Sequence, residues 1–115
     1  MSRDATVFLR HILLCLDKIA TYTSEGRDAF LVDSRTQDAV IRNLEIIGQA
    51  VKDLGTQNLS HLEPEVPWHQ IAGLRNVLAH QYLGVDIALV WRVVEDHLPA
   101  LRSAVENALG DTSEG

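Results

Sequence analysis

Residues 33–55, with the sequence DSRTQDAVIRNLEIIGQAVKDLG, show the clearest structural pattern of the chain. Apolar side chains recur there at alternating spacings of four and three, the period of a helix with one buried stripe: Val40, Leu44, Ile47, Val51 and Leu54. Asp33 or Ser34 supplies an N-cap, and Gly55 is a residue type that commonly ends helices. The pattern predicts one long helix that buries this stripe.

Helical periodicity continues on both sides of this stretch. Residues 3–22 form a predicted helix with one buried stripe, and residues 27–31 form a single turn that covers the core with Phe30. Residues 56–67 hold two of the three prolines and show little periodicity. We therefore expect them to be the one long connection of the domain.

The second half of the chain is also expected to be helical. Pro67 suits the first turn of a helix over residues 68–80. A last helical segment, residues 87–109, follows an N-cap at Asp86 and contains Pro99, which would kink or split it. The sequence contains no alternating run typical of a strand. The fold class is therefore predicted to be all-α, a four- to five-helix up-and-down bundle.

Length and composition are those of one globular domain. The 115 residues are 46% hydrophobic and 23% charged. We expect a single helical domain over residues 1–110 and a short polar tail over residues 111–115. No stretch approaches the roughly 20 apolar residues of a membrane-spanning helix, and the single cysteine, Cys15, forms no internal disulfide. These features predict a soluble, cytoplasmic protein without a signal peptide.

The charge balance bears on possible partners. A net charge of −6 argues against a broad electrostatic surface for nucleic acid. A small site that cuts RNA stays possible, because cleavage requires only a few groups around one phosphate, whereas affinity comes from many phosphate contacts.

One predicted helix carries side chains suited to phosphate chemistry. Over residues 68–80, spacings of four, three and four create a polar stripe of His69, Gly73, Asn76 and His80. Arg75 flanks this stripe rather than lying within it. Arg75 and His80 would therefore meet at one substrate only at a fraying helix end or with help from a second subunit.

Together these groups can act on a phosphodiester without a metal. Histidine exchanges protons near neutral pH, and Arg75 offers a planar, charged fork to a phosphate. Asn76 can donate to a phosphoryl oxygen or hold the imidazole in one tautomer, and Tyr82 adds a hydroxyl. In RNA the neighbouring 2′-hydroxyl can serve as the nucleophile. An arginine and a histidine on one helix are also commonly structural, so the spacing alone leaves both interpretations open.

Residues 75–82, RNVLAHQY, contain an arginine, four residues, a histidine, one residue and a tyrosine. This motif resembles that of the HepT-like ribonuclease toxins within the HEPN superfamily. Stretches similar to that family extend over nearly the whole chain: residues 43–50, 66–74, 90–91 and 98–101. One departure is Gln49, where many relatives have glutamate.

The resemblance implies a HEPN-like bundle that forms a homodimer. It implies a metal-independent endoribonuclease that acts as the toxin of a type II/VII-like toxin–antitoxin pair. Arg75 and His80 would be catalytic and Asn76 would assist, with the 2′-hydroxyl attacking in line and leaving a 2′,3′-cyclic phosphate. The site would lie in a cleft between two copies of this helix, where Gly73 would let the helices approach closely. The resemblance implies no cofactor.

The resemblance also implies a protein partner. This partner is an antitoxin, a minimal nucleotidyltransferase of the MNT type, whose relatives attach AMP to the motif tyrosine, here Tyr82. The adenylate would add bulk and negative charge beside Arg75 and His80, and so would block the cleft.

Three further residues are candidates for lining the RNA cleft. Arg42 begins a second Arg-Asn dipeptide, and Trp68, next to His69, could stack on a base. Trp68 is also suited to a core or interface position, and Arg42 to a helix surface. The remaining histidines lack partners at metal-ligand spacing, so we predict no metal site: His11, His61 and His97.

Two other functions stay open from the sequence. One is a non-catalytic helical subunit that binds nucleotide or scaffolds a nucleotidyltransferase complex, and the other is a plain dimerisation module. Only the nuclease requires His80 as an acid–base group.

Overall fold

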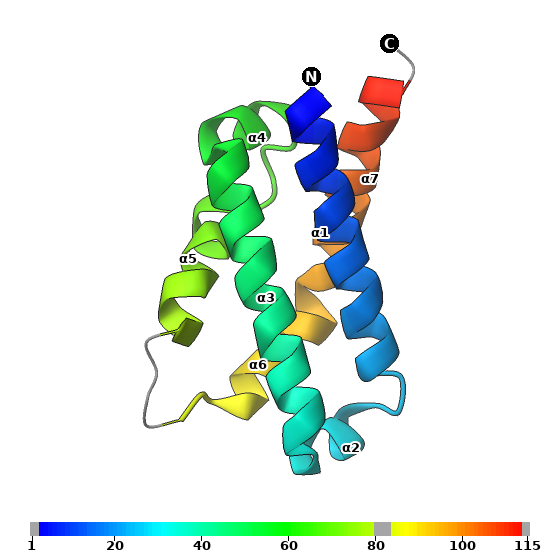
Figure 1. Ribbon diagram of the computed structural model, residues 1–115, viewed down its shortest axis with the longest axis vertical. Helices are drawn as coiled ribbons and strands as arrows, with labels where there is room; N and C mark the ends of the chain where they lie inside the picture. Colours follow the sequence, from blue (N-terminus) through cyan, green and yellow to red (C-terminus); the bar gives the residue numbers. More distant parts are fainter. Residues whose placement is uncertain (1–2, 80–83, 114–115) are drawn as a thin grey trace.

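A computed structural model describes residues 3–79 and 84–113, and the side chains of residues 4–78 and 84–110. These residues form seven α-helices and no strand, so the all-α prediction is confirmed (Figure 1). None of the described helices is long and apolar enough to cross a membrane. In chain order the helices are α1 (Arg3–Tyr22), α2 (Arg27–Val32), α3 (Ser34–Leu54), α4 (Thr56–Leu62), α5 (Trp68–Ala79), α6 (Ile87–Asp96) and α7 (Leu98–Ser113).

The long helix expected from residues 33–55 is α3, which lies at the centre of the bundle. It packs against α1 on one side and α5 on the other (Figure 1). Asp33 is its N-cap, and the carboxylate accepts hydrogen bonds from two backbone N–H groups of the first turn, at 3.0 and 3.4 Å. Gly55 follows its last residue with a φ of 92°, a conformation that favours glycine. Both predicted ends are confirmed.

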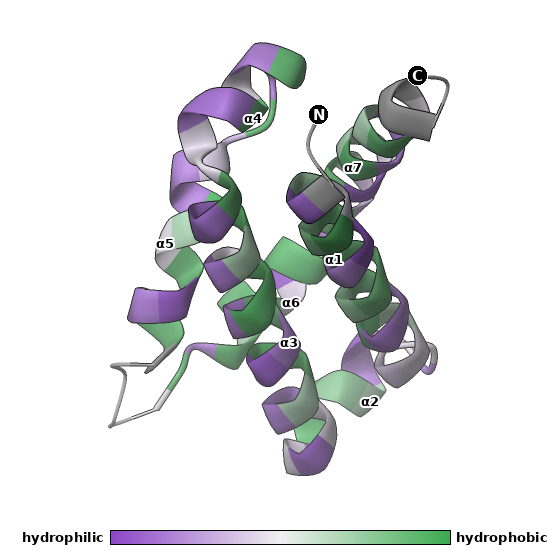
Figure 2. Ribbon diagram, turned by 45° about the horizontal axis from the view of Figure 1, so that its top comes forward, coloured by the Kyte–Doolittle hydropathy of each residue, from purple (hydrophilic) through white to green (hydrophobic). Residues whose placement is uncertain are grey.

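The hydrophobic core fills the space between α3 and the helices around it. Val40, Leu44, Ile47 and Val51 of the predicted stripe are buried. Burial of each large apolar side chain stabilises the fold by about 1.5–3 kcal/mol. In Figure 2 the hydrophobic residues of α1 and α3 lie toward the interior of the bundle and the hydrophilic residues lie outward.

The connection expected at residues 56–67 is partly helical, which corrects the prediction. Helix α4 occupies its first part and buries Leu59 in the core. Two turns are too short to show a clear period, and the burial of Leu59 provides the stabilisation that propensity does not. Both prolines of the segment, Pro64 and Pro67, lie beyond the end of α4, so neither interrupts it.

The split expected near Pro99 is confirmed. His97 separates α6 from α7, and Pro99 is the second residue of α7, where its missing N–H needs no helical partner. Asp86 caps α6 as predicted by accepting a hydrogen bond from the backbone N–H of Leu89 at 3.2 Å. Helix α7 continues to Ser113 and so includes part of the expected polar tail.

The Asp33 cap predicts a pH-dependent contribution to stability. Hydrogen bonds from the Thr36 hydroxyl, at 2.9 Å, and from backbone N–H groups lower the pKa of Asp33. Because the pKa of Asp33 is lower in the folded state, its ionised form stabilises the fold. This contribution is fully present above the unfolded-state pKa, about 3.9. It is lost as the pH falls through the folded-state pKa. We therefore expect the melting temperature of wild type to fall more steeply in this acid range than that of Asp33→Ala, as measured by circular dichroism. Identical pH slopes for the two proteins would contradict this role.

Candidate active site

Helix α5 carries the described part of the motif and lies very close to α3. A Cβ atom at Gly48 would lie 2.8 Å from the carbonyl oxygen of Ile71 and 3.0 Å from the backbone nitrogen of Arg75. Both neighbours are backbone atoms, so no flexible side chain can move aside. Glycine at position 48 therefore permits the close spacing between α3 and α5. This spacing determines the position of the Arg75 backbone relative to α3.

Helix α5 packs its apolar side on the bundle and exposes the motif side. Ile71 and Leu78 pack against the core, whereas Arg75 and Asn76 are exposed. Nη1 of Arg75 donates a hydrogen bond to Oδ1 of Asn76 at 3.2 Å. Among the described side chains, none of the ion pairs includes Arg75. Its charge is therefore available to an anionic ligand.

Arg75 lines a groove of about 500 Å³ together with residues of α1 and α3. Helix α3 contributes Arg42 and Gln49, and α1 contributes Phe8 and His11. We call this the arginine groove. It brings together two guanidinium groups and an imidazole from three helices, a combination of donors suited to a phosphate.

Two carboxylates also line the arginine groove, and each contacts a neighbouring side chain. Nη1 of Arg42 lies 3.7 Å from Oε2 of Glu45, and Nε2 of Gln49 donates a hydrogen bond to Oδ1 of Asp53 at 2.9 Å. The Arg42 side chain is still 72% exposed, and such a surface pair contributes little. Gln49 therefore donates to a carboxylate, at a position where a glutamate would add another negative charge.

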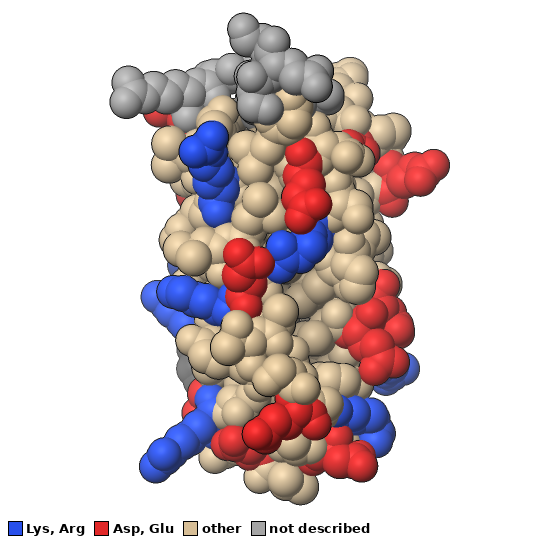
Figure 3. Space-filling model, turned by 90° about the vertical axis from the view of Figure 1, so that its right-hand side faces the viewer, with Lys and Arg blue, Asp and Glu red and all other residues tan. Residues whose placement is uncertain are grey.

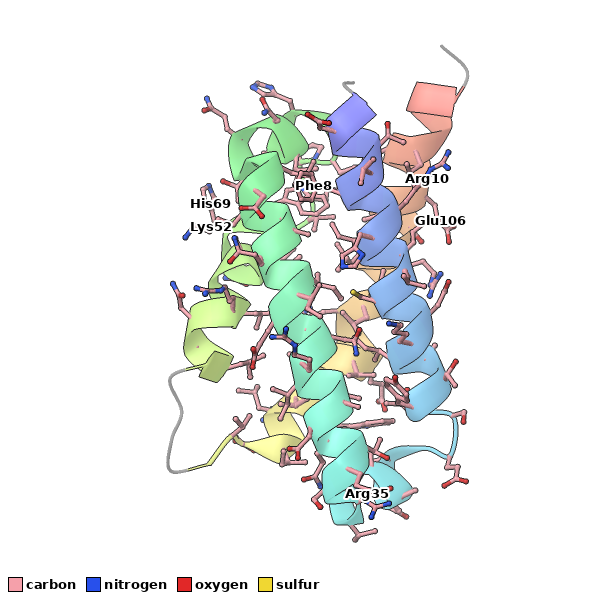
Figure 4. All side chains as sticks on the ribbon, viewed as in Figure 1. Phe8, Arg10, Arg35, Lys52, His69 and Glu106 are labelled. Carbon is pink, nitrogen blue, oxygen red and sulfur yellow. The ribbon has the colours of Figure 1, made fainter. Side chains whose placement is uncertain are left out.

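His69 and Gly73 do not line the arginine groove with Arg75. The Nδ1 atom of His69 lies 3.2 Å from Oγ1 of Thr56, at the start of α4, and His69 does not line the arginine groove (Figure 4). A Cβ atom at Gly73 would meet nothing within 4 Å among the described atoms. Of the three stripe residues that the structure describes, only Asn76 is hydrogen-bonded to the Arg75 side chain.

Trp68 is a core residue. Its side chain is 2% exposed, and its Nε1 donates a hydrogen bond to the carbonyl oxygen of Glu63 at 2.9 Å. The core interpretation is confirmed. This burial leaves the ring no face for a base, which removes Trp68 from the candidate cleft.

His80 and Tyr82, the remaining motif residues, lie outside the described residues. Their roles stay predictions. Across residues 3–79 and 84–113, no three His, Cys, Asp or Glu side chains are grouped to hold a metal ion.

The contributions of Gly48, Phe8 and His11 were not predicted from the sequence. A glycine inside a long helix costs about 1 kcal/mol relative to alanine, so Gly48 is a recognisable signal of close backbone approach. Phe8 and His11 carry no such signal. Their relation to Arg75 arises only when α1, α3 and α5 pack together.

Elsewhere the surface carries mixed charge. Figure 3 shows Lys and Arg side chains interspersed with Asp and Glu on the face formed by α1 and α7. Arg102 on this side is paired with Asp17 at 2.7 Å and with Glu106 at 3.6 Å. This face therefore offers no broad positive surface to nucleic acid, as the net charge of −6 predicts.

Comparison with known proteins gives matches over nearly the whole chain. The family model Ribonuclease HepT-like matches residues 12–108. The chain is 38% identical to the probable ribonuclease HepT of Thermococcus cleftensis, covering 92% of this chain and 96% of that protein. It is 37% identical to a putative RNase of Methanocaldococcus jannaschii, covering 95% and 90% of the two chains. No solved structure matches the chain significantly.

A further relative combines two activities in its name. It is the gamma-glutamylcyclotransferase and putative RNase of Methanocaldococcus jannaschii, which is 37% identical over 91% of this chain. This chain spans 47% of that relative's length. The similarity therefore covers only part of that protein.

Proposed function

This chain belongs to the HepT-like ribonuclease family, and from that membership we propose that it is a metal-independent endoribonuclease and the toxin of a toxin–antitoxin pair. One structural observation supports the proposal most strongly. Arg75 is exposed, belongs to none of the ion pairs of the described residues, and shares a groove with a second arginine. An exposed guanidinium without an ion-pair partner can bind a phosphate in the bidentate manner typical of arginine.

Arg75 and His80 are the proposed catalytic pair. The RNA 2′-oxygen forms a bond to phosphorus while the bond between phosphorus and the 5′-oxygen breaks. One imidazole accepts the proton of the 2′-hydroxyl, and a protonated imidazole gives a proton to the leaving 5′-oxygen. The guanidinium of Arg75 stabilises the negative charge on the non-bridging oxygens. The products are a 2′,3′-cyclic phosphate and a 5′-hydroxyl.

Asn76 is proposed to assist by restraining Arg75. Its Oδ1 accepts the hydrogen bond from Nη1 of Arg75 at 3.2 Å, which limits the positions open to the guanidinium. The amide nitrogen of the same side chain can still donate to a phosphoryl oxygen. Asn76 thus contributes both to the position of Arg75 and to binding of the phosphate.

A second copy of the chain is proposed to complete the site. Each copy brings one Arg75 and one His80, so a homodimer supplies two imidazoles for the two proton transfers. Gly73 supports this arrangement, because a Cβ atom there would meet none of the described atoms within 4 Å, and the lack of a side chain lets α5 of a second copy approach.

Tyr82 is the proposed site of control by a nucleotidyltransferase antitoxin. The partner would transfer AMP from ATP to the tyrosine hydroxyl, releasing pyrophosphate and placing negative charge beside the catalytic pair. We expect Tyr82→Phe to cleave RNA within a factor of a few of wild type but to gain no adenylate mass when incubated with the partner and ATP. Intact-protein mass spectrometry measures the modification. Adenylation of Tyr82→Phe to the wild-type extent would rule out this position.

Expression without any partner tests the toxin proposal. Wild type and His80→Ala are produced at matched levels, and growth and total-RNA integrity are followed. We expect wild type to arrest growth and fragment RNA, and His80→Ala to do neither while keeping the same helical circular dichroism. If folded wild type neither slows growth nor cuts RNA, the proposal fails and a non-catalytic nucleotide-binding or scaffolding subunit replaces it.

A further inference from the structure

Phe8 joins the arginine groove to a second cavity. This cavity, of about 430 Å³, lies between the beginning of α1 and α4. Phe8 and Asp53 line both the cavity and the arginine groove. The two depressions therefore adjoin, and together they extend from α4 along α1 and α3 to Arg75.

The two parts differ in chemistry. The arginine groove is lined by Arg42 and Arg75 and also by the carboxylates of Glu45 and Asp53, and of the two arginines Arg75 has no ion-pair partner among the described side chains. The second cavity is lined by Leu54, Leu59 and Leu62, of which Leu62 is 42% exposed, and also by the polar side chains of Asp4, Asp53, Asn58 and His61. Single-stranded nucleic acid has the matching pair of features, because charged phosphates alternate along it with flat, weakly polar bases.

The Phe8 ring lies where the two parts meet. Figure 4 shows Phe8 between α1 and α3, on the side of α4. The side chain is half-buried against the core and lines both depressions. The aromatic pair of the described residues is Phe30 with Trp91, so no described ring stacks on Phe8. The part of the ring that lines the two depressions is therefore not covered by another described aromatic ring.

The two arginines lie at different levels of the groove. The backbone nitrogen of Arg75 lies beside Gly48, six residues beyond Arg42 along α3. At 1.5 Å per residue this offset is about 9 Å along the helix axis. The two guanidinium groups can therefore contact different phosphates of one strand.

We infer that the arginine groove and the cavity beside Phe8 bind one single-stranded segment of the RNA substrate. Arg75 contacts the scissile phosphate, Arg42 contacts a flanking phosphate, and a neighbouring base stacks on Phe8. This inference rests on the proposed function, which identifies the scissile phosphate. A base that stacks on Phe8 must be unstacked from the adjacent bases of its strand. We therefore expect unpaired RNA to be preferred over duplex RNA.

Binding to an uncleavable strand tests the role of Phe8. The probe is a short mixed-sequence oligoribonucleotide with methylated 2′-hydroxyls, and its Kd is measured by fluorescence anisotropy. Phe8→Leu keeps an apolar side chain but removes the aromatic face, and is expected to raise Kd about tenfold. Tyr22→Leu is the matched control, because it makes the equivalent change at an exposed aromatic residue near the other end of α1. Its Kd should stay at the wild-type value.

The salt dependence of the same binding tests Arg42. Arg42→Gln is expected to weaken binding and to lower the slope of log Kd against log salt concentration by about 0.7. Arg35→Gln is the control, because Arg35 is exposed on the same helix but lies at its far end (Figure 4). That control should keep the wild-type slope.

Cleavage of unmodified RNA of the same sequence separates this inference from the proposed function. Phe8→Leu is expected to lower kcat/KM about tenfold on single-stranded RNA, in proportion to its loss of binding. Failure of wild type to bind the probe, or wild-type Kd in either Phe8→Leu or Arg42→Gln, overturns the inference even if RNA is cleaved. Binding that depends on Phe8 and Arg42, without cleavage by wild type, supports the groove and contradicts the nuclease proposal.

Discussion

Arg75→Ala is expected to lower the rate of RNA cleavage by roughly 10²–10³-fold, the cost of removing one preorganised group that stabilises charge in a transition state. The loss should appear mainly in kcat, because the extra negative charge on the phosphorane oxygens develops only during reaction. Arg75→Lys should recover part of the rate, since it keeps the charge but lacks the planar fork that can bind two oxygens.

Single-turnover cleavage of a labelled RNA measures this effect. Arg92→Ala is a suitable control, because Arg92 is exposed on α6 and does not line the arginine groove. Stability should change little in Arg75→Ala, because the side chain is exposed and lies outside the ion pairs of the described residues. Cleavage by folded Arg75→Ala at the wild-type rate would show that this guanidinium is not part of the site.

Gly48→Ala is expected to impair both stability and cleavage. The new methyl group would meet backbone atoms of Ile71 and Arg75 at 2.8 and 3.0 Å, so α5 must move away from α3. Overpacking of this kind typically costs about 1–3 kcal/mol. A shift of about 1 Å in a group that positions substrate can also cost about 10²-fold in rate, so we expect a loss of this size in kcat/KM.

Chemical denaturation and cleavage assays measure the two effects separately. Gly110→Ala is the matched control, because Gly110 is also helical and a Cβ atom there would meet none of the described atoms within 4 Å. It should retain full activity and gain slight stability, because alanine favours a helix more than glycine does. Wild-type stability and activity in Gly48→Ala would mean that the approach of α3 and α5 does not position Arg75.

The sequence predicted those helices that are long enough to show a period and that carry local end signals. Residues 33–55 contain both a buried stripe and two caps, and α3 follows them closely. Helix α4 was missed because seven residues give too few turns for a pattern, and its stability depends on burying Leu59 in the core. Local signals therefore sufficed where a helix is long enough to show its apolar period and its caps, and failed where a short helix depends on the burial of one residue.

The candidate site was predictable only in part for the same reason. The motif identified Arg75 and Asn76 because their chemistry and spacing lie within one helix. The relation of Phe8 and His11 to Arg75 depends on how α1 packs on α3, which no local pattern encodes. Trp68 was ambiguous because a tryptophan suits both a core and a stacking surface, and only its burial decided between them.

The most direct test of the central claim is the chemistry of the ends that the purified chain leaves on RNA. A defined single-stranded RNA is incubated with wild type and with His80→Ala, with and without a metal chelator, and both ends of the products are identified by mass spectrometry. We expect 2′,3′-cyclic phosphate and 5′-hydroxyl ends from wild type, in equal yield with chelator, and at least about 10²-fold less product from His80→Ala. Absence of cleavage, ends that carry 3′-hydroxyl and 5′-phosphate groups, or undiminished cleavage by His80→Ala would contradict it.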